Sequence, residues 1–189
     1  INSDLDMRMN QQESLKAENI INLFSYEELV SIFQNYGEER YSKSIAKKIV
    51  DNRPIFKTKE LINLIKDALP KQNPIYIEKS IRKIFQAIRI EVNDELNELK
   101  KSLTSIKDVI SKNGVIICIS YHSLEDKIVK NFMSELTIGC TCDPSIAICV
   151  CNNVESFKFP NKKKYYPSDE EVETNSRAKS ATLRYVIKL

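Results

Sequence analysis

The segment 115–130 constrains the fold more than any other part of the sequence. Five apolar residues, Val115 to Ile119, follow Gly114 and predict a strand that is covered on both faces. A short polar cluster comes next, and a helical pattern follows the cluster. Ligands bind at the carboxyl ends of strands in open α/β sheets. The sequence therefore predicts an α/β fold with functional residues at this strand-to-helix corner.

The polar cluster consists of Ser120, Tyr121, His122 and Ser123. Ser123, with Asp126 three residues later, is typical of a helix N-cap with an acidic partner, which would fix the turn locally. His122 is the single histidine of the chain. An imidazole can move a proton near neutral pH, so His122 is a candidate catalytic group, but a single histidine is more often structural. Both interpretations stay open at this point.

Length and charge narrow the class of protein. The chain has 189 residues, enough for one good core or two small ones. Its 29 Lys and Arg against 26 Asp and Glu say little about partners, but basic side chains gather between Lys158 and Leu189. Such a tail suits a polyanion, and a solvated surface is the alternative. No apolar run approaches the roughly 18 residues of a membrane span, so we expect no membrane partner.

The first part of the chain, from about Glu13 to Ser111, carries an almost unbroken helical pattern. Ser25 and Glu28 form a capping-box signature at the start of one helix. Thr58 is expected to cap a later helix. Apolar residues recur every three or four positions from Glu78 to Ser111, which predicts one long helix with a core face.

A second, polar stripe runs along this long helix and consists of Arg82, Gln86, Arg89 and Asn93. Two guanidinium groups and two amides on one helix face can bind phosphates or the edge of a base. The alternative is a solvated face, or a buried network that ties the helix to its neighbours. The near absence of acids on the stripe weakens this alternative without excluding it, so both interpretations stay open.

Four cysteines form two close pairs, Cys140 with Cys142 and Cys149 with Cys151. Four thiolates can hold a zinc ion tetrahedrally. The single residue within each pair is, however, a tighter spacing than zinc ribbons and fingers use. A reduced loop without metal is one alternative, and a disulfide-linked loop is another, although nothing else in the sequence suggests an oxidising compartment.

The last residues of the chain predict a strand beside a basic cluster. From Thr182 to Leu189 polar and apolar residues alternate well enough for a terminal strand. Arg177, Lys179 and Arg184 lie just before or within this strand. They are candidates for contact with a polyanion.

Five motifs, in their order and spacing, resemble the S-adenosylmethionine-dependent 16S ribosomal RNA cytosine-N4 methyltransferase family. They are Asp6-Met-Arg8-Met, Tyr36-Gly-Glu-Glu-Arg40, Phe85-Gln-Ala-Ile-Arg89-Ile-Glu-Val-Asn93, Ile119-Ser-Tyr-His-Ser-Leu-Glu-Asp126 and Asn175-Ser-Arg-Ala-Lys-Ser180. Together they cover essentially the whole chain, and the paired-cysteine loop also resembles a feature of some members. Mild departures occur at Asn10, Tyr121, Ser176 and Lys179, where the family tends to have Asp, Phe, Pro and Arg.

The resemblance implies a partial Rossmann-like class I methyltransferase sheet with a large inserted helical domain that recognises RNA. Residues 1–10 would end the first methyltransferase segment, residues 11–111 would form the insertion, and residues 112–189 would complete the methyltransferase domain with a cysteine-rich loop at 139–152. The loop that holds S-adenosylmethionine in the family precedes the Asp-Met-Arg-Met motif. The cofactor-binding residues are therefore expected upstream of Ile1, and we expect no turnover from this chain alone.

The resemblance also implies the reaction and its residues. The intact enzyme would transfer a methyl group from S-adenosylmethionine to N4 of a cytosine in 16S ribosomal RNA of the small ribosomal subunit. The candidate catalytic residues are Asp6, Ser120, His122 and Ser123. The candidate RNA-binding residues are Arg8, Arg40, Arg82, Gln86, Arg89, Asn93, Arg177, Lys179 and Arg184. The spacing of the cysteines, rather than the resemblance, gives the candidate ligands of a structural zinc, which are Cys140, Cys142, Cys149 and Cys151. We expect a cytoplasmic protein, with an organelle and a homodimer left open.

Two other classes of function remain as alternatives. A non-catalytic RNA-binding or adaptor module would use the helical part and the basic tail alone. A zinc-stabilised interaction domain would depend on the four cysteines. Neither class explains the ordered set of motifs, so a fragment of the methyltransferase is the preferred prediction.

Overall fold

The computed structural model describes residues 2–70, 73–140, 142–143, 148, 150–151, 154–160, 162 and 164–189. The chain forms two compact units, Ile1–Glu95 and Leu96–Leu189. The domain bounds predicted from the sequence, at residues 10 and 111, stay a prediction. A search of the described helices for one long and apolar enough to cross a membrane finds none.

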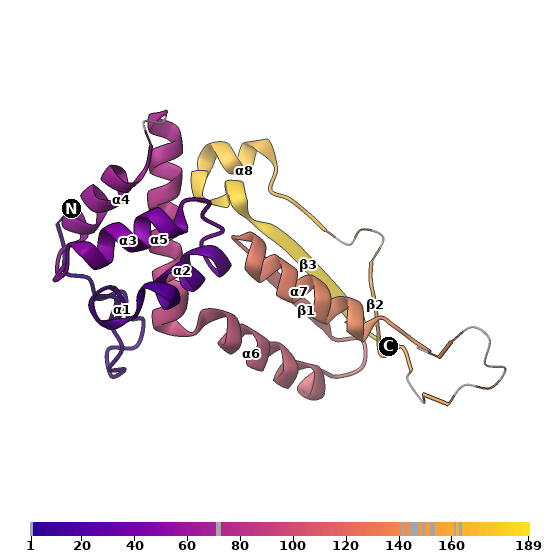
Figure 1. The fold of residues 1–189 in the computed structure, drawn as a ribbon. Coiled ribbons are helices and arrows are strands. Elements are labelled where there is room, and N and C mark those ends of the chain that lie inside the picture. The colour runs from indigo at the N-terminus through magenta and orange to yellow at the C-terminus, as the bar shows by residue number, and fades with distance from the viewer. Residues whose placement is uncertain are drawn as a thin grey trace. The chain divides into compact units, whose positions relative to one another are not determined.

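The first unit is built from five helices around one core (Figure 1). They are α1 (Ala17–Leu23), α2 (Tyr26–Asn35), α3 (Ser42–Asp51), α4 (Thr58–Ala68) and α5 (Pro74–Asn93). Helix α5 contacts α1, α2 and α4, and Phe33, Ile45, Leu61 and Ile88 are fully buried in the core. The predicted helical character of this part of the chain is confirmed, because each helix presents its apolar stripe to the same interior.

Two helix starts in this unit test the capping predictions. At α2, Ser25 Oγ accepts from the Glu28 N–H, and the Glu28 carboxylate accepts from the Ser25 N–H at 2.7 Å, so the capping box is confirmed. Helix α4 begins at Thr58, but its cap residue is Lys57, whose N–H donates to Glu60 at 3.0 Å. The prediction that Thr58 is the cap is therefore wrong. Its hydroxyl accepts instead from the Ser3 N–H, a partner that a local pattern cannot reveal.

The predicted single helix from Glu78 to Ser111 is also wrong. Helix α5 ends at Asn93, and α6 (Glu95–Val109) begins two residues later. Asp94 between them has φ of 49°, in the left-handed region that Asp adopts more readily than most residues. The apolar spacing continues past this residue and therefore conceals the break.

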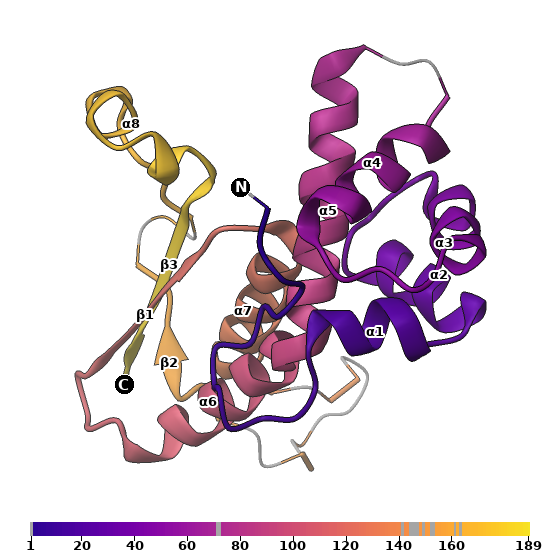
Figure 2. The ribbon, with the colours of Figure 1, turned by 90° about the vertical axis from the view of Figure 1, so that its left-hand side faces the viewer.

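The second unit combines a small sheet with helices (Figure 2). After α6 its elements are β1 (Val115–Ser120), α7 (Ser123–Leu136), β2 (Phe157–Lys158), α8 (Asp169–Thr174), the 3-10 helix η1 (Ser176–Ser180) and β3 (Thr182–Lys188). The strand order is β1-β3-β2 with antiparallel pairing throughout. The α/β class and the terminal strand are confirmed, whereas the Rossmann-like arrangement stays a prediction.

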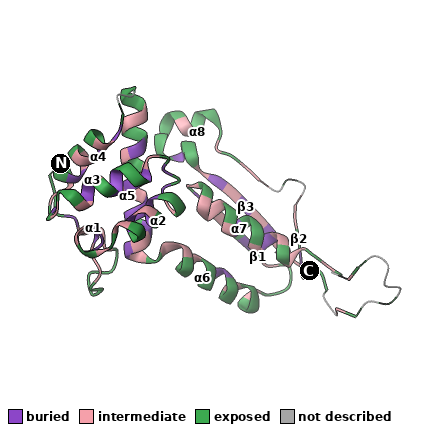
Figure 3. Ribbon diagram, viewed as in Figure 1, coloured by how far each residue is buried: buried purple, intermediate pink, exposed green. Residues whose placement is uncertain are grey.

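Among the described residues, only one face of β1 is covered. Ile116 and Val186, which pair across β1 and β3, are buried with Val129 and Met133 of α7. The opposite face carries Ile117, which is 61% exposed, and buried and exposed residues alternate along the strand (Figure 3). The prediction of burial on both faces is therefore wrong for this chain. A continuous apolar run shows that both faces can be buried, but not which of them is covered.

Candidate functional site

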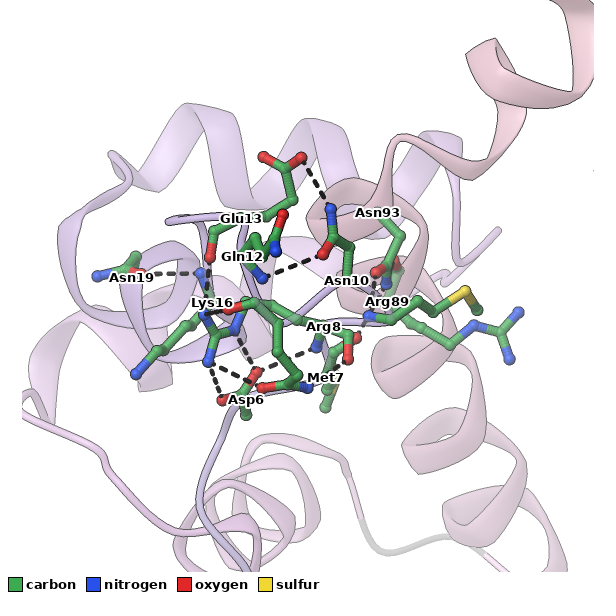
Figure 4. A network of polar contacts seen from close by, with 12 residues as sticks. Asp6, Met7, Arg8, Asn10, Gln12, Glu13, Lys16, Asn19, Arg89 and Asn93 are labelled. Atoms are coloured by element: carbon green, nitrogen blue, oxygen red, sulfur yellow. Dashed lines mark hydrogen bonds and ion pairs between the residues drawn. The ribbon is translucent and has the colours of Figure 1, made fainter.

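The predicted catalytic residues lie in two polar networks, one in each unit. In the first unit, the Asp6 carboxylate and the Arg8 guanidinium form a bidentate pair, with N–O distances of 2.7 and 2.8 Å (Figure 4). The remaining Arg8 nitrogen, Nη1, donates to the backbone carbonyls of Gln11 and Glu13. Arg8 is thus used inside the protein to shape the segment that follows Asp6, which leaves it little capacity for RNA.

Arg8 also decides the protonation state of Asp6. The hydrogen bonds and charge of the Arg8 guanidinium lower the pKa of the Asp6 carboxyl from 3.8 to about 2. A carboxylate with so low a pKa is a weak base near neutral pH. Asp6 can therefore accept a hydrogen bond from a bound group, but it is poorly suited to keep a proton.

Asn93 at the end of α5 holds the residues that follow Asp6. Its Oδ1 accepts from the Met9 N–H at 2.7 Å, and its Nδ2 donates to the Met7 carbonyl at 2.9 Å (Figure 4). The backbone of Met7 has φ of 62°, in the left-handed region. Asn93 therefore joins two motifs that lie 84 residues apart and braces an unusual backbone conformation.

Of the other side chains in the polar stripe of α5, two form contacts inside the protein and one extends into solvent. Arg89 forms a bidentate pair with Glu95, at 2.7 and 2.9 Å, and Gln86 donates to the Tyr36 carbonyl at 3.4 Å. Arg82 is 83% exposed and lies 3.7 Å from the similarly exposed Glu78. The alternative of an internal network thus describes Gln86, Arg89 and Asn93, whereas Arg82 remains available to a ligand.

An open pocket of about 510 Å³ lies between this stripe and the first motif. Its lining residues are Met7, Met9, Arg82, Phe85, Gln86 and Arg89. An aromatic ring and two thioethers beside two guanidinium groups offer both a stacking surface and positive charge. Phe85 is partly buried against the core of the first unit and lies one residue before Gln86 of the polar stripe.

In the second unit, the strand-to-helix corner is built differently from the prediction. Ser123 is the first residue of α7, and the cap is His122, whose Nδ1 accepts from the Glu125 N–H at 3.4 Å. The Glu125 carboxylate accepts in return from the N–H groups of Tyr121 and His122. The prediction of Ser123 and Asp126 as the capping pair is wrong by one residue, because Glu125 reaches back over the turn. Ser120 is buried at the end of β1.

His122 has a second ring nitrogen that the cap does not use. Its Nε2 is buried and, within the described part of the chain, has no hydrogen-bond partner of good geometry, although Glu125 Oε1 lies 3.3 Å away. Burial of Glu125 opposes ionisation, but bonds from His122 and from the Tyr121 N–H outweigh it and lower the Glu125 pKa. The structural interpretation of His122 is therefore supported, with one nitrogen left for another role.

Arg184 and Asp126 form the strongest ion pair of this unit's interior. Arg184 Nε and Nη2 bind the Asp126 carboxylate at 2.7 and 3.0 Å, and the Arg184 side chain is 8% exposed. The Arg184 guanidinium lowers the pKa of Asp126, and Asp126 raises the pKa of Arg184. Arg184 thus ties β3 to α7, and its predicted contact with RNA gains no support from the geometry.

The other basic candidates lie at the surface. Arg40 is exposed, and its guanidinium carbon lies 5.8 Å from the centre of the Tyr41 ring. Arg177 and Lys179 are exposed on η1. Of the nine candidates for RNA binding, Arg40, Arg177 and Lys179 are therefore exposed and form no ion pair within the described chain, and Arg82 is exposed with a solvent-accessible pair to Glu78.

Three of the four predicted zinc ligands lie in the described part of the chain. The sulfur atoms of Cys140, Cys142 and Cys151 all lie within 4.8 Å of one another. Cys149 lies outside the described residues. The three cysteines that the structure describes therefore lie close together, as their spacing in the sequence predicts.

The described residues do not fit a site for S-adenosylmethionine. A donor of this kind binds where a glycine-rich turn leads from a strand to the free N–H groups of a helix. The three glycines of the chain, Gly37, Gly114 and Gly139, lie in no such turn. In the first turn of α7, the Glu125 N–H donates to His122 Nδ1 instead.

Comparison with known proteins shows which family this chain resembles. A model of the MraW methylase family matches residues 2–189. The ribosomal RNA small subunit methyltransferase H of Halothermothrix orenii is 45% identical over 183 residues, which are 95% of this chain and 59% of that protein. The proteins of the same name from Clostridium botulinum strain Loch Maree and from Mycoplasmopsis synoviae are 45% and 43% identical, each over 188 residues.

The match covers nearly all of this chain but only part of its relatives. The chain spans about 60% of the length of these curated relatives. The motifs that carry the resemblance lie within the matched residues 2–189. Because the family model matches residues 2–189, the chain belongs to the MraW methylase family.

Proposed function

We propose that this chain is part of an enzyme that transfers a methyl group from S-adenosylmethionine to N4 of a cytosine in 16S ribosomal RNA. The observation that carries the proposal is the clamp of Asn93 on Met7 and Met9, because it assembles two family motifs around one pocket. The names of the relatives support ribosomal RNA of the small subunit as the substrate. We propose the small subunit, or its RNA, as the partner.

The pocket of the first unit is proposed to hold a nucleotide of the RNA. The Phe85 ring offers a face for a base, and stacking of this kind contributes about 1–3 kcal/mol per base. Arg82 can approach a phosphate, because its side chain extends into solvent. N4 of cytosine is a poor nucleophile, since its lone pair is delocalised into the ring, so catalysis depends on how the base is held.

Asp6 and His122 are proposed to position groups rather than to take protons. The pKa of about 2 makes Asp6 a permanent hydrogen-bond acceptor. His122 Nδ1 accepts from the Glu125 N–H, so the neutral ring carries its proton on Nε2. That nitrogen is buried 3.3 Å from Glu125 Oε1, so a bound acceptor would compete with this carboxylate for it. S-adenosylmethionine would supply the methyl group, and we propose that residues outside this chain bind it.

RNA binding by the chain itself tests the first part of the proposal. We expect it to bind 16S ribosomal RNA, with an affinity that falls steeply as salt rises. Phe85→Ala and Arg82→Ala should each weaken binding, whereas Lys79→Ala removes an exposed charge from the same helix outside the pocket and should weaken it less. If Lys79→Ala and Arg82→Ala weaken binding equally and Phe85→Ala has no effect, the pocket is not the nucleotide site.

A test of the role of His122 requires the complete enzyme and two variants of it. His122→Ala removes both the cap and the imidazole and should cost about 1 kcal/mol of stability. His122→Asn removes the imidazole but keeps a good capping residue. If His122 positions the substrate, both variants should lower transfer of labelled methyl to 16S RNA while RNA affinity stays unchanged. Full activity of His122→Asn would limit this histidine to capping.

Calorimetry with S-adenosylmethionine tests whether the complete protein is a methyltransferase or a non-catalytic adaptor. This chain should release no heat of binding, and the complete protein should bind the donor. A complete protein that binds RNA but neither binds the donor nor transfers methyl groups would favour the adaptor module instead.

A further inference from the structure

Three cysteines with no part in the proposed methyl transfer lie together between α7 and β2. The sulfur atoms of Cys140, Cys142 and Cys151 are all within 4.8 Å of one another, and those of Cys140 and Cys151 are 3.8 Å apart. We propose that these three thiolates bind one zinc ion. The site is independent of the proposed RNA pocket and of the residues that form it.

The distance between the sulfurs distinguishes a metal site from a disulfide. Zinc–sulfur bonds of about 2.3 Å in tetrahedral geometry place two sulfurs about 3.8 Å apart. A disulfide requires about 2.05 Å. The separation of Cys140 and Cys151 therefore equals the edge of a zinc tetrahedron and is too long for a covalent bond. The upper limit of 4.8 Å for the other pairs requires a contraction of no more than about 1 Å.

The surrounding fold brings the two ends of this segment together without a metal. The Ser156 N–H donates to the Leu136 carbonyl at 3.4 Å, and the Leu189 N–H donates to the Ser156 carbonyl at 3.0 Å. Gly139 lies so close to Glu155 that a Cβ at Gly139 would be 3.9 Å from that residue. The ends are thus fixed next to α7 and the sheet, and ion binding would close only the short path from Cys140 to Cys151.

A backbone N–H group is directed at one of the three sulfur atoms. The Val150 N–H donates to Cys142 Sγ at 3.3 Å. Donors of this kind stabilise the charge of a metal-bound thiolate and orient its lone pairs. By contrast, burial raises the pKa of Cys118 in β1, so that thiol is a poor ligand.

The apolar side chains that the structure describes in this segment are exposed and do not hold it in place. Ile148, Val150 and Val154 are each more than 70% exposed. Small segments without a core are commonly stabilised by metals or disulfides. Thiolates select soft or borderline ions, and zinc suits a set of thiolates in near-tetrahedral positions. A water molecule or another donor would complete the fourth position.

Metal analysis of the tag-free chain tests the proposal. We expect about one zinc per chain by inductively coupled plasma mass spectrometry after purification with a reductant. Cys140→Ser and Cys142→Ser should each lower the zinc content severalfold. Cys118→Ser removes a thiol outside the group and should keep it. Circular dichroism shows whether each variant is folded, and the core of the second unit should persist because it excludes these cysteines.

Cobalt substitution gives a second, spectroscopic result. Cobalt bound by these thiolates should show sulfur-to-metal charge-transfer bands and the intense visible bands of tetrahedral coordination, and both should be lost in Cys142→Ser. Three outcomes overturn the proposal. They are a folded chain that takes up neither ion while its thiols react fully with a thiol reagent, a disulfide between these cysteines in the reduced preparation, and an iron–sulfur chromophore.

Discussion

Arg184 of β3 binds Asp126 of α7 through two hydrogen bonds, of 2.7 and 3.0 Å, in the interior of the second unit. Asp126 belongs to the motif that contains His122, and Arg184 follows the motif that ends at Ser180. The ion pair therefore links one family motif to the strand that follows another motif. In both units, side chains that resemble ligand-binding groups in the sequence hold distant segments together.

Removal of one partner of this pair should destabilise the second unit strongly. Arg184→Ala leaves Asp126 partly buried without its counter-charge, and loss of a buried partner costs about 3 kcal/mol. Urea denaturation, with hydrogen exchange of β3 as the local probe, measures the loss. Arg177→Ala is the matched control, because Arg177 is exposed on η1 and its loss should leave stability unchanged. Equal stability of both variants would show that the pair contributes little.

The one-sided burial of β1 predicts opposite results for adjacent residues. Ile116→Ala should cost about 2–5 kcal/mol, because it leaves a cavity beside α7. Ile117→Ala removes an exposed side chain and should cost less than about 1 kcal/mol through strand propensity alone. Denaturation curves of the two variants provide the comparison. Similar losses would mean that another surface covers Ile117 in solution, which sedimentation at several concentrations would detect.

The two glycines that follow helices should respond differently to alanine. A Cβ at Gly37 would lie 2.7 Å from the Phe33 carbonyl oxygen and 3.1 Å from that of Lys83. Both atoms belong to the backbone, so Gly37→Ala should destabilise the first unit by about 1–3 kcal/mol. A Cβ at Gly139 would meet ordinary contacts at 3.9 Å, so Gly139→Ala should stay within about 0.5 kcal/mol of the parent. Thermal unfolding monitored by circular dichroism distinguishes the two.

Asp6 should contribute stability that depends on pH. Its pKa is about 2 in the folded protein, chiefly because of the hydrogen bond from Arg8, and the ordinary value of 3.8 applies to the unfolded chain. The unfolded chain therefore binds more protons in this interval, and the contribution is present above about pH 4 and disappears as pH falls through 2. Asp6→Asn should thus be less stable than the parent at neutral pH, and the difference should shrink below pH 4.

Denaturation at several pH values measures this difference. Asp67→Asn provides a control, because it removes an equal charge from an exposed position of α4 in the same unit. It should change stability little at any pH. A constant difference between Asp6→Asn and the parent from pH 7 to pH 2 would contradict the proposed ionic role of Arg8.

The sequence by itself determined the elements that depend on periodicity. The apolar spacing of Leu29 and Phe33 suffices to define a helix and its buried side, and Ser25 with Glu28 suffices to start it. The strand at Val115 and the terminal strand at Thr182 follow from equally local patterns. The family motifs are also local, so the sequence alone placed the chain in its class.

The tertiary structure decided which partner each polar or apolar side chain meets. Sequence could not show that Asn93 bonds to Met7, or that Arg184 meets Asp126, because these partners are 86 and 58 residues apart. It could not show the break at Asp94 either, since the apolar spacing continues across a left-handed residue. Local pattern fixes where a side chain can be buried or charged, whereas hydrogen-bond partners are chosen by the segments that folding brings together.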